Sequence, residues 1–269
     1  MHNLTLVRVG PENLAECGIG YIRNRENPGY GRKVEWLRKR FAEGLRFLLF
    51  RDEKETPLAF LEYVPGEFAW RPVDAQGWLF VHCLWVFAAG RRIRGLGSRL
   101  IQACIEEAQR AGSIGVAAMV SNGTWMAGKE IFLKNGFTKT AERDRFELVI
   151  RRLREGTEPC FRDVDENIVR YRGLHIEYSD QCPMLWKSVA DLSEMAAEYG
   201  LKLRATVLKS AHEAQNAPSY YGTFSLLWNG QLLSDHYVSK GRFRNILRKD
   251  ILNRKEFQST ARQRASQPF

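Results

Sequence analysis

The 269-residue sequence lacks an apolar run as long as about 18 residues, and no signal peptide opens it. We therefore expect a soluble, cytoplasmic protein without a membrane partner. Cysteine is scarce, and the few cysteines are far apart, with no C-x-x-C pair. They are Cys17, Cys83, Cys104, Cys160 and Cys182. This spacing excludes a disulfide framework and a zinc site, so we expect reduced thiols and no bound metal.

Acidic residues are too few to balance the basic ones, and the formal net charge is +10. Residues 240–269 hold nine Lys or Arg against Asp250 and Glu256, so this segment alone carries +7. From residue 254 onward it has no apolar periodicity, which predicts a flexible basic tail over 254–269. A tail of this kind explains much of the charge, so nucleic acid is not the expected partner, although binding to RNA stays an alternative.

Three glycines and four arginines lie in AAGRRIRGLGSRL, residues 88–100. The stretch lacks the Lys-Ser/Thr pair of a P-loop, and it lacks the third glycine of a dinucleotide fingerprint. The remaining pattern, Arg92-x-x-Gly95-x-Gly97, has the spacing R/Q-x-x-G-x-G/A. Glycines there let the backbone approach a pyrophosphate, and successive N–H groups at a helix N-terminus point at it. The segment therefore predicts a phosphate-binding loop.

Regular elements flank this loop. WLFVHCLWVF before it is predicted to form a buried strand, and LGSRLIQACIEEAQRAG after it an amphipathic helix. A second strand, IGVAAMVS, and the segment NGTWMAGKEIFLKNGF follow. The loop, this order of elements and the G-F ending resemble the acyl-CoA-binding core of the GNAT acyltransferases. The resemblance implies an α/β (α+β) fold with a mixed central sheet.

The rest of the first half agrees with that order. Strands are expected at residues 4–9, 45–52, 58–64 and 145–153, and a helix at 31–44 with Val34, Leu37 and Phe41 inward. We expect a GNAT domain over residues 1–153 and a linker without periodicity over 154–172.

A second unit is predicted over residues 173–253. LHIEYS is a strand that leads to Cys182 and a helix, LKLRATVL is a strand, and TFSLLWNGQLLSDHYV is a hairpin with its turn at Asn229-Gly230. With the closing helix GRFRNILRKDIL, this pattern resembles a smaller thioredoxin-like α/β domain. A thiol at a helix N-terminus has a lowered pKa, but no resolving cysteine follows Cys182, so a purely structural cysteine stays open.

Longer stretches carry a further resemblance. EYVPGEFAWRPV, VHCLWV, YSDQCP and SLLWNGQLL resemble the YoaP-type GNAT proteins, over nearly the whole chain except the tail. The resemblance implies an acyl-CoA-dependent N-acyltransferase with acetyl-CoA as the expected donor. The implied cofactor-binding residues are Trp85, Val86, Arg92, Arg94, Gly95, Leu96, Gly97, Ser98, Asn122 and Phe132. Phe132 stands where many GNATs have a tyrosine that protonates the leaving thiolate, and it has no proton to give.

Attack on a thioester needs a neutral amine and therefore a base. His82 ranks first because its reference pKa suits the role, and Glu62 and Glu67 rank behind it. Strand alternation predicts that Cys83 faces the side opposite His82. A core histidine satisfied by the backbone is the alternative for His82.

The expected acceptor is the amine of a small metabolite, with a carboxylate as one option, and Trp70, Arg71 and Cys182 are the expected substrate-binding residues. A thiol-dependent binding or redox module that uses Cys182, with the GNAT half recognising a ligand, is the alternative function. The oligomeric state is undetermined by the sequence, and a homodimer stays open.

Overall fold

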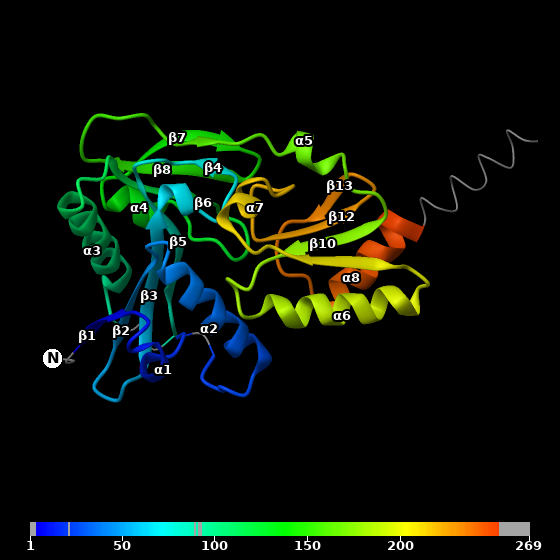
Figure 1. Cartoon of the computed structure of the whole chain (residues 1–269), viewed down its shortest axis with the longest axis horizontal. Coiled ribbons are helices and arrows are strands. Elements are labelled where there is room, and N and C mark those ends of the chain that lie inside the picture. The colour runs from blue at the N-terminus through cyan, green and yellow to red at the C-terminus, as the bar shows by residue number, and fades with distance from the viewer. Residues whose placement is uncertain (1–3, 21, 89, 91–92, 253–269) are drawn as a thin grey trace, which may run out of the picture.

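The computed structural model describes residues 4–20, 22–88, 90 and 93–252, and it contains two main sheets (Figure 1). The larger sheet has seven strands in the order β1-β2-β3-β5-β6-β8-β7. They are β1 (Thr5–Val9), β2 (Arg46–Arg51), β3 (Pro57–Pro65), β5 (Leu79–Val86), β6 (Gly115–Val120), β7 (Thr138–Arg143) and β8 (Phe146–Arg152). Because β5 and β6 are parallel and the other pairs are antiparallel, the sheet is mixed, as predicted.

Helices cover both faces of this sheet. α1 (Leu14–Cys17) and α2 (Pro28–Phe41) pack on one face, and α3 (Leu96–Arg110) and α4 (Glu130–Lys134) on the other. α2 begins where the Asn27 side chain accepts a hydrogen bond from Gly29 N, with Pro28 in the first turn. The predicted inward residues are only partly right: Leu37 is buried, whereas Val34 and Phe41 are half-buried. Two cations, Lys33 and Arg40, belong to the buried stripe instead.

Pairing between β5 and β6 is short. Three residue pairs, from Leu79↔Val116 to Val81↔Ala118, join them, although β5 continues to Val86 and β6 to Val120. In the described part of the chain, the second half of β5 therefore pairs only with β3. The two strands diverge there, and no strand among the described residues pairs with this half of β5 on the β6 side.

The smaller sheet has the order β11-β10-β12-β13. Its strands are β10 (Leu174–Tyr178), β11 (Leu203–Val207), β12 (Phe224–Trp228) and β13 (Gln231–Ser234). α6 (Leu185–Glu198) connects the parallel strands β10 and β11, and α8 (Lys240–Ile246) with the π-helical turn η3 (Leu247–Leu252) follows β13. Asn229 and Gly230 both have positive φ in the hairpin turn, as predicted for this dipeptide. The order of strands and helices agrees with the predicted βαβ and ββα pattern.

The predicted linker between the two sheets contains short regular elements. β9 (Cys160–Phe161) pairs with β4 (Val73–Asp74), and α5 (Asp165–Ile168) follows. The indole nitrogen of Trp78 donates to the carbonyl of Thr157 at 2.8 Å. Backbone pairing and aromatic contacts order this segment despite its lack of periodicity. No helix of the described residues is long and apolar enough to span a membrane.

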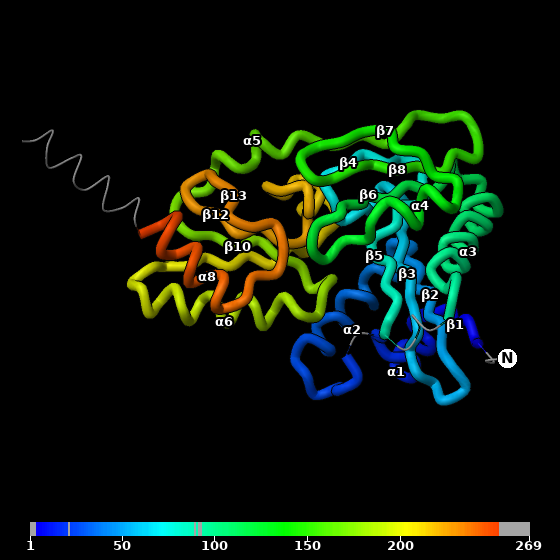
Figure 2. Tube along the Cα trace, turned by 180° about the vertical axis from the view of Figure 1, so that it is seen from behind, coloured from blue at the N-terminus to red at the C-terminus, as the bar shows by residue number. Residues whose placement is uncertain are grey.

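One hydrophobic cluster runs from the α2 face of the larger sheet into the smaller sheet. α2 and α6 meet near their first turns, as both views show (Figures 1 and 2). At this contact, a Cβ on Gly29 would stand 2.0 Å from the carbonyl oxygen of Pro183. A Cβ on Gly222 would stand 2.9 Å from the backbone of Trp70 and Arg71. These two glycines permit the close approach of the two halves.

Candidate active site

The predicted phosphate loop leads into a groove at the N-terminus of α3. Gly95 takes a left-handed conformation with φ of 83° and precedes the first helical residue. A Cβ on Gly97 would stand 2.5 Å from Cδ1 of Ile131, so this glycine lets α3 approach α4. The groove, about 410 Å³ in volume, is lined by Val86, Ile93, Arg94, Gly95, Leu96, Gly97, Ser98, Glu130, Ile131 and Lys134. It brings together six of the predicted cofactor residues, whereas Arg92 lies outside the described residues.

The other predicted cofactor residues lie elsewhere. Trp85 is 37% exposed on the diverging half of β5, and Asn122 is exposed after β6. Phe132 is 1% exposed, and its ring packs against Phe137 with centroids 5.3 Å apart. The prediction for Phe132 is therefore not supported, because its side chain fills the core beneath α3 rather than the groove.

A β-bulge on β5 corrects the expected orientation of Cys83. Glu62 of β3 pairs with Cys83, and the next residue, Tyr63, pairs with Val81, so His82 is an extra residue. A bulge places two successive residues against one partner residue and breaks the alternation of side chains. His82 contacts the ring of Trp36, and Cys83 packs against the same hydrophobic cluster. Both therefore face α2.

His82 has the environment of a core histidine. Its Nε2 accepts a hydrogen bond from Trp70 N at 2.9 Å, so the proton of the neutral ring is on Nδ1. Burial lowers the pKa of His82 well below its usual value, and the charges of Arg71 and Lys33 add to this effect. Because Nε2 already accepts a hydrogen bond, this geometry does not support the prediction that His82 is the first candidate for the general base.

Glu67 lies away from the diverging strands. It is exposed in the turn η1 (Gly66–Phe68), and one carboxylate oxygen accepts from Gly77 N at 3.4 Å. Pro65 pairs with Leu79, which places this turn at the start of β5, whereas the strands diverge at its end. The structure does not bring Glu67 together with the other candidates.

Glu62 is fully buried on the α2 face. Its Oε1 lies 2.7 Å from Nζ of Lys33, and both side chains have 0% exposure. The contact is an ion pair rather than an aligned hydrogen bond, and neither Glu62 oxygen has a hydrogen-bond partner among the described residues. Lys33 also lies 4.3 Å above the ring of Trp36. Sequence reasoning missed Lys33 because a lysine on a surface helix is normally solvated.

Arg71 joins the two halves of the molecule. Its Nη1 donates to Trp70 O at 3.0 Å, to Thr223 Oγ1 at 3.1 Å and to Gln181 Oε1 at 3.4 Å. Its guanidinium carbon lies 5.0 Å from the ring centroid of Tyr221. The sequence suggested Arg71 but no signal pointed to Gln181, Thr223 or Tyr221, which come from the second half.

Cys182 lies in the same buried cluster, three residues before α6 begins. Burial raises the pKa of its thiol, and a backbone hydrogen bond from Met184 and the charge of Lys33 oppose this only in part. The expected lowering of its pKa by a helix N-terminus is therefore wrong, because loss of solvent outweighs the helix contribution.

Comparisons with known proteins match both halves. The acetyltransferase (GNAT) family profile matches residues 18–124, and the YoaP-like profile matches residues 203–245. A protein of Bacillus subtilis (strain 168), named uncharacterized N-acetyltransferase YoaP, is 28% identical over 221 residues, which are 80% of this chain and 86% of that protein. The chain therefore contains a GNAT acetyltransferase domain and a YoaP-like domain. From here on, the larger sheet with its helices is the GNAT domain, and the smaller sheet with its helices is the YoaP-like domain.

Solved acetyltransferase structures align with part of the chain at low identity. A GNAT acetyltransferase from Staphylococcus aureus Mu50 aligns with 56% of this chain and 99% of its own, with 11% identity and a TM-score of 0.42. A GNAT acetyltransferase from Brucella melitensis, solved in complex with acetyl-CoA, aligns with 58% of this chain and 95% of its own, with 18% identity and a TM-score of 0.35.

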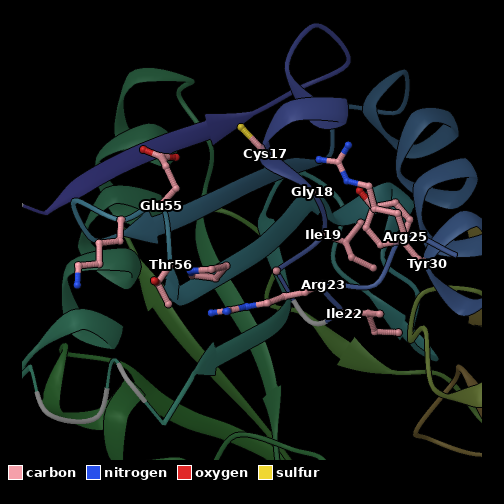
Figure 3. Close-up of a pocket in the computed structure, with 12 residues that line it drawn as sticks. Cys17, Gly18, Ile19, Ile22, Arg23, Arg25, Tyr30, Glu55 and Thr56 are labelled. Atoms are coloured by element: carbon pink, nitrogen blue, oxygen red, sulfur yellow. The ribbon is translucent and has the colours of Figure 1, made fainter. Parts of the chain in front are cut away.

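A hollow of about 240 Å³ lies on the GNAT domain between the segment after α1 and the turn from β2 to β3 (Figure 3). Arg23, Arg25 and Lys54 line it. A Cβ on Gly20, which also lines it, would stand 3.6 Å from the ring of Phe87, just beyond the end of β5. Glu55 lines the hollow as well, so its charged side chains leave a net positive charge near the end of the diverging strand.

The raised pKa of Cys182 in the YoaP-like domain gives a test of thiol chemistry. At neutral pH we expect iodoacetamide to alkylate Cys182 at least ~10-fold more slowly than Cys160, because thiolate is the reactive form and Cys160 is exposed. Mass spectrometry of peptides from timed reactions measures both rates in one sample, and Cys182→Ser identifies the signal. Faster alkylation of Cys182 than of Cys160 would restore the alternative of an activated thiol.

Proposed function

We propose that the protein is an acetyl-CoA-dependent N-acetyltransferase that acetylates the amine of a small molecule. The observation that carries this proposal is the continuity of three features in the GNAT domain. The groove at the N-terminus of α3 includes Val86 at the end of β5, β5 diverges from β6 at that end, and Glu62 faces Cys83 on the diverging segment. A groove at a helix N-terminus, a strand edge that pairs with no strand of the described residues and a buried carboxylate therefore follow one another.

The groove suits the diphosphate of acetyl-CoA. Backbone N–H groups of the first turn of α3 are unpaired within the helix, and the positive end of its dipole favours anions. Arg94 and Lys134 line the same groove together with Glu130, so the charged side chains leave it with a net positive charge. The extended pantetheine arm then takes the place of a strand partner along β5, and backbone N–H groups near Trp85 and Val86 polarise the thioester carbonyl.

In the acetyl-transfer step, the neutral amine nitrogen attacks the carbonyl carbon of the thioester. A C–N bond forms, the C–S bond breaks, and its electron pair leaves with the CoA thiolate. The amine proton passes to Glu62, directly or through one water molecule. We assign the base to Glu62 rather than to His82 because Glu62 Oε2 has no hydrogen-bond partner among the described residues, whereas His82 Nε2 is engaged by Trp70 N.

Acetyl-CoA binding tests the groove with a matched pair of variants. Gly95 and Gly112 flank α3, both have positive φ, and a Cβ on either meets nothing within 4 Å. Both alanine variants therefore carry similar backbone strain, but only Gly95→Ala places a methyl group in the groove. We expect Gly95→Ala to weaken acetyl-CoA binding at least ~10-fold, about 1.4 kcal/mol, and Gly112→Ala to leave it unchanged. Calorimetric titration measures both, and equal affinities would contradict the assignment of the groove.

A further inference from the structure

Arg71 is a buried cation without a charged partner. It is 6% exposed, and its three hydrogen-bond partners, Trp70 O, Gln181 Oε1 and Thr223 Oγ1, are all uncharged. In the part of the chain that the structure describes, no carboxylate is ion-paired with it. Burying an unpaired charge costs free energy, so a buried cation is normally paired with an anionic group of the protein or of a bound ligand.

The nearby charges are already neutralised. Glu62, whose charge reaches Arg71, is paired with Lys33, and Arg40 is paired with Glu43 at 2.8 Å. The excess positive charge of this buried cluster therefore rests on Arg71. A single guanidinium group fits a carboxylate, because two of its N–H groups can donate parallel hydrogen bonds to the two carboxylate oxygens.

A second unused donor accompanies it. Gln181 is 7% exposed and receives the Arg71 bond through its oxygen, whereas its amide nitrogen has no hydrogen-bond partner among the described residues. Buried amide groups are nearly always paired, so an unpaired one beside an uncompensated cation indicates a missing acceptor. The oxygens of Glu62, also unpaired by hydrogen bonds, provide acceptors in the same cluster.

We propose that Arg71 and Gln181 bind the carboxylate of the acetyl acceptor while Glu62 faces its amine, so that the acceptor belongs to the class of small amino acids. This proposal rests on the proposed function and names the acceptor class of the same site. Arg71 comes from the GNAT domain, whereas Gln181 and Thr223 come from the YoaP-like domain. The acceptor site is therefore complete only when the two domains are docked, and the YoaP-like domain supplies part of its specificity.

The cluster reaches the surface at two half-buried side chains. Cys83 of β5 and Cys182 of the YoaP-like domain are partly exposed, and both lie close enough to Arg71 and Tyr221 to be coupled to them electrostatically. Cys83 also pairs with Glu62 across the sheet. The proposed acceptor would reach Arg71 from this partly exposed side of the cluster.

The test compares acceptors that differ only in the carboxylate. Purified full-length protein with acetyl-CoA is offered the common L-amino acids, β-alanine and γ-aminobutyrate, each beside its primary amide, and released CoA is measured. With wild-type protein we expect kcat/KM for the preferred amino acid to exceed that of its amide about 100-fold. In Arg71→Gln this preference should vanish, because kcat/KM falls for the amino acid and stays unchanged for its amide. Equal use of amino acids and amides by wild-type protein would overturn the proposal.

A milder variant guards against misfolding of Arg71→Gln. Gln181→Leu removes the unpaired amide without leaving a new buried polar group, so it should fold and still lower the amino-acid preference about 10-fold. Unchanged preference in a folded Gln181→Leu would remove Gln181 from the site. Thermal shift with millimolar amino acid provides a readout independent of activity, with acetate as the anion control.

The two proposals fail in different ways. Transfer to carboxylate-free amines as good as to amino acids would leave the acetyltransferase function standing and overturn the acceptor class. If no amine is acetylated, the proposed function fails, and the anion site is judged by stabilisation alone. The carboxylate site is then supported if amino acids raise the Tm of wild-type protein, if their amides do not, and if amino acids do not raise the Tm of Gln181→Leu. Any other result overturns it.

Discussion

Glu62→Gln should lower kcat for acetyl transfer at least ~100-fold and leave the Kd for acetyl-CoA unchanged. Glutamine keeps the shape of the side chain but cannot take the amine proton. The groove for acetyl-CoA is formed by other residues, so donor binding should persist. Steady-state kinetics and calorimetric titration measure the two quantities separately.

The ion pair with Lys33 complicates this variant. Glu62→Gln leaves a fully buried ammonium group without a counter-charge, which costs about 3–5 kcal/mol of folding stability. The double variant Lys33→Met/Glu62→Gln removes both charges and should recover most of that stability while staying inactive. If activity returned together with stability, Glu62 would be a structural residue, and the proton would have to go elsewhere.

His82→Gln is the control from the neighbouring strand. Burial holds the pKa of His82 below its value in the unfolded chain, so the folded protein keeps His82 neutral. This contribution to folding stability is complete above about pH 6.5, and it declines as the pH falls below 6.5. His82→Gln should lose stability because the Trp70 N–H loses its acceptor. It should keep the acid limb of the wild-type pH–rate profile, because the proposed base is Glu62. Disappearance of that limb in His82→Gln would return the role of base to His82.

Gly29→Ala should destabilise the protein by at least ~3 kcal/mol and loosen the contact between the domains. Its Cβ would stand 2.0 Å from the carbonyl oxygen of Pro183 and 2.6 Å from Nε1 of Trp186. The first of these is a backbone atom, so relief requires α2 and the segment before α6 to separate. Chemical unfolding and limited proteolysis of the segment between the sheets measure the effect.

Gly31→Ala is the matched control on the same helix. A Cβ on Gly31 meets nothing within 4 Å, so this variant should stabilise α2 by about 0.5–1 kcal/mol. If the docked domains form the acceptor site, Gly29→Ala should also raise KM for the acceptor more than it weakens acetyl-CoA binding. Equal stability of the two variants would show that α2 and α6 do not pack as closely as described.

The sequence by itself determined the features that depend on neighbouring residues. The spacing of Gly95 and Gly97 before an amphipathic pattern indicated a tight turn into a helix, and Asn229-Gly230 indicated the hairpin turn. Both are local, because a left-handed backbone or a helix start is set by residues within one turn. The strands, the main helices and the split into two sheets followed from periodicity for the same reason.

The tertiary structure alone decided which polar side chains are buried together. Lys33 and Arg40 match a solvated helix face in sequence, and only the approach of β3 and the YoaP-like domain buries them. The bulge at His82 depends on the register between β3 and β5, which no pattern within one strand reveals. Arg71 and Gln181 are 110 residues apart, and their contact exists because Gly29 and Gly222 let the two domains approach. The energy of a buried charge depends on partners distant in the chain, so the site could not be predicted from local sequence.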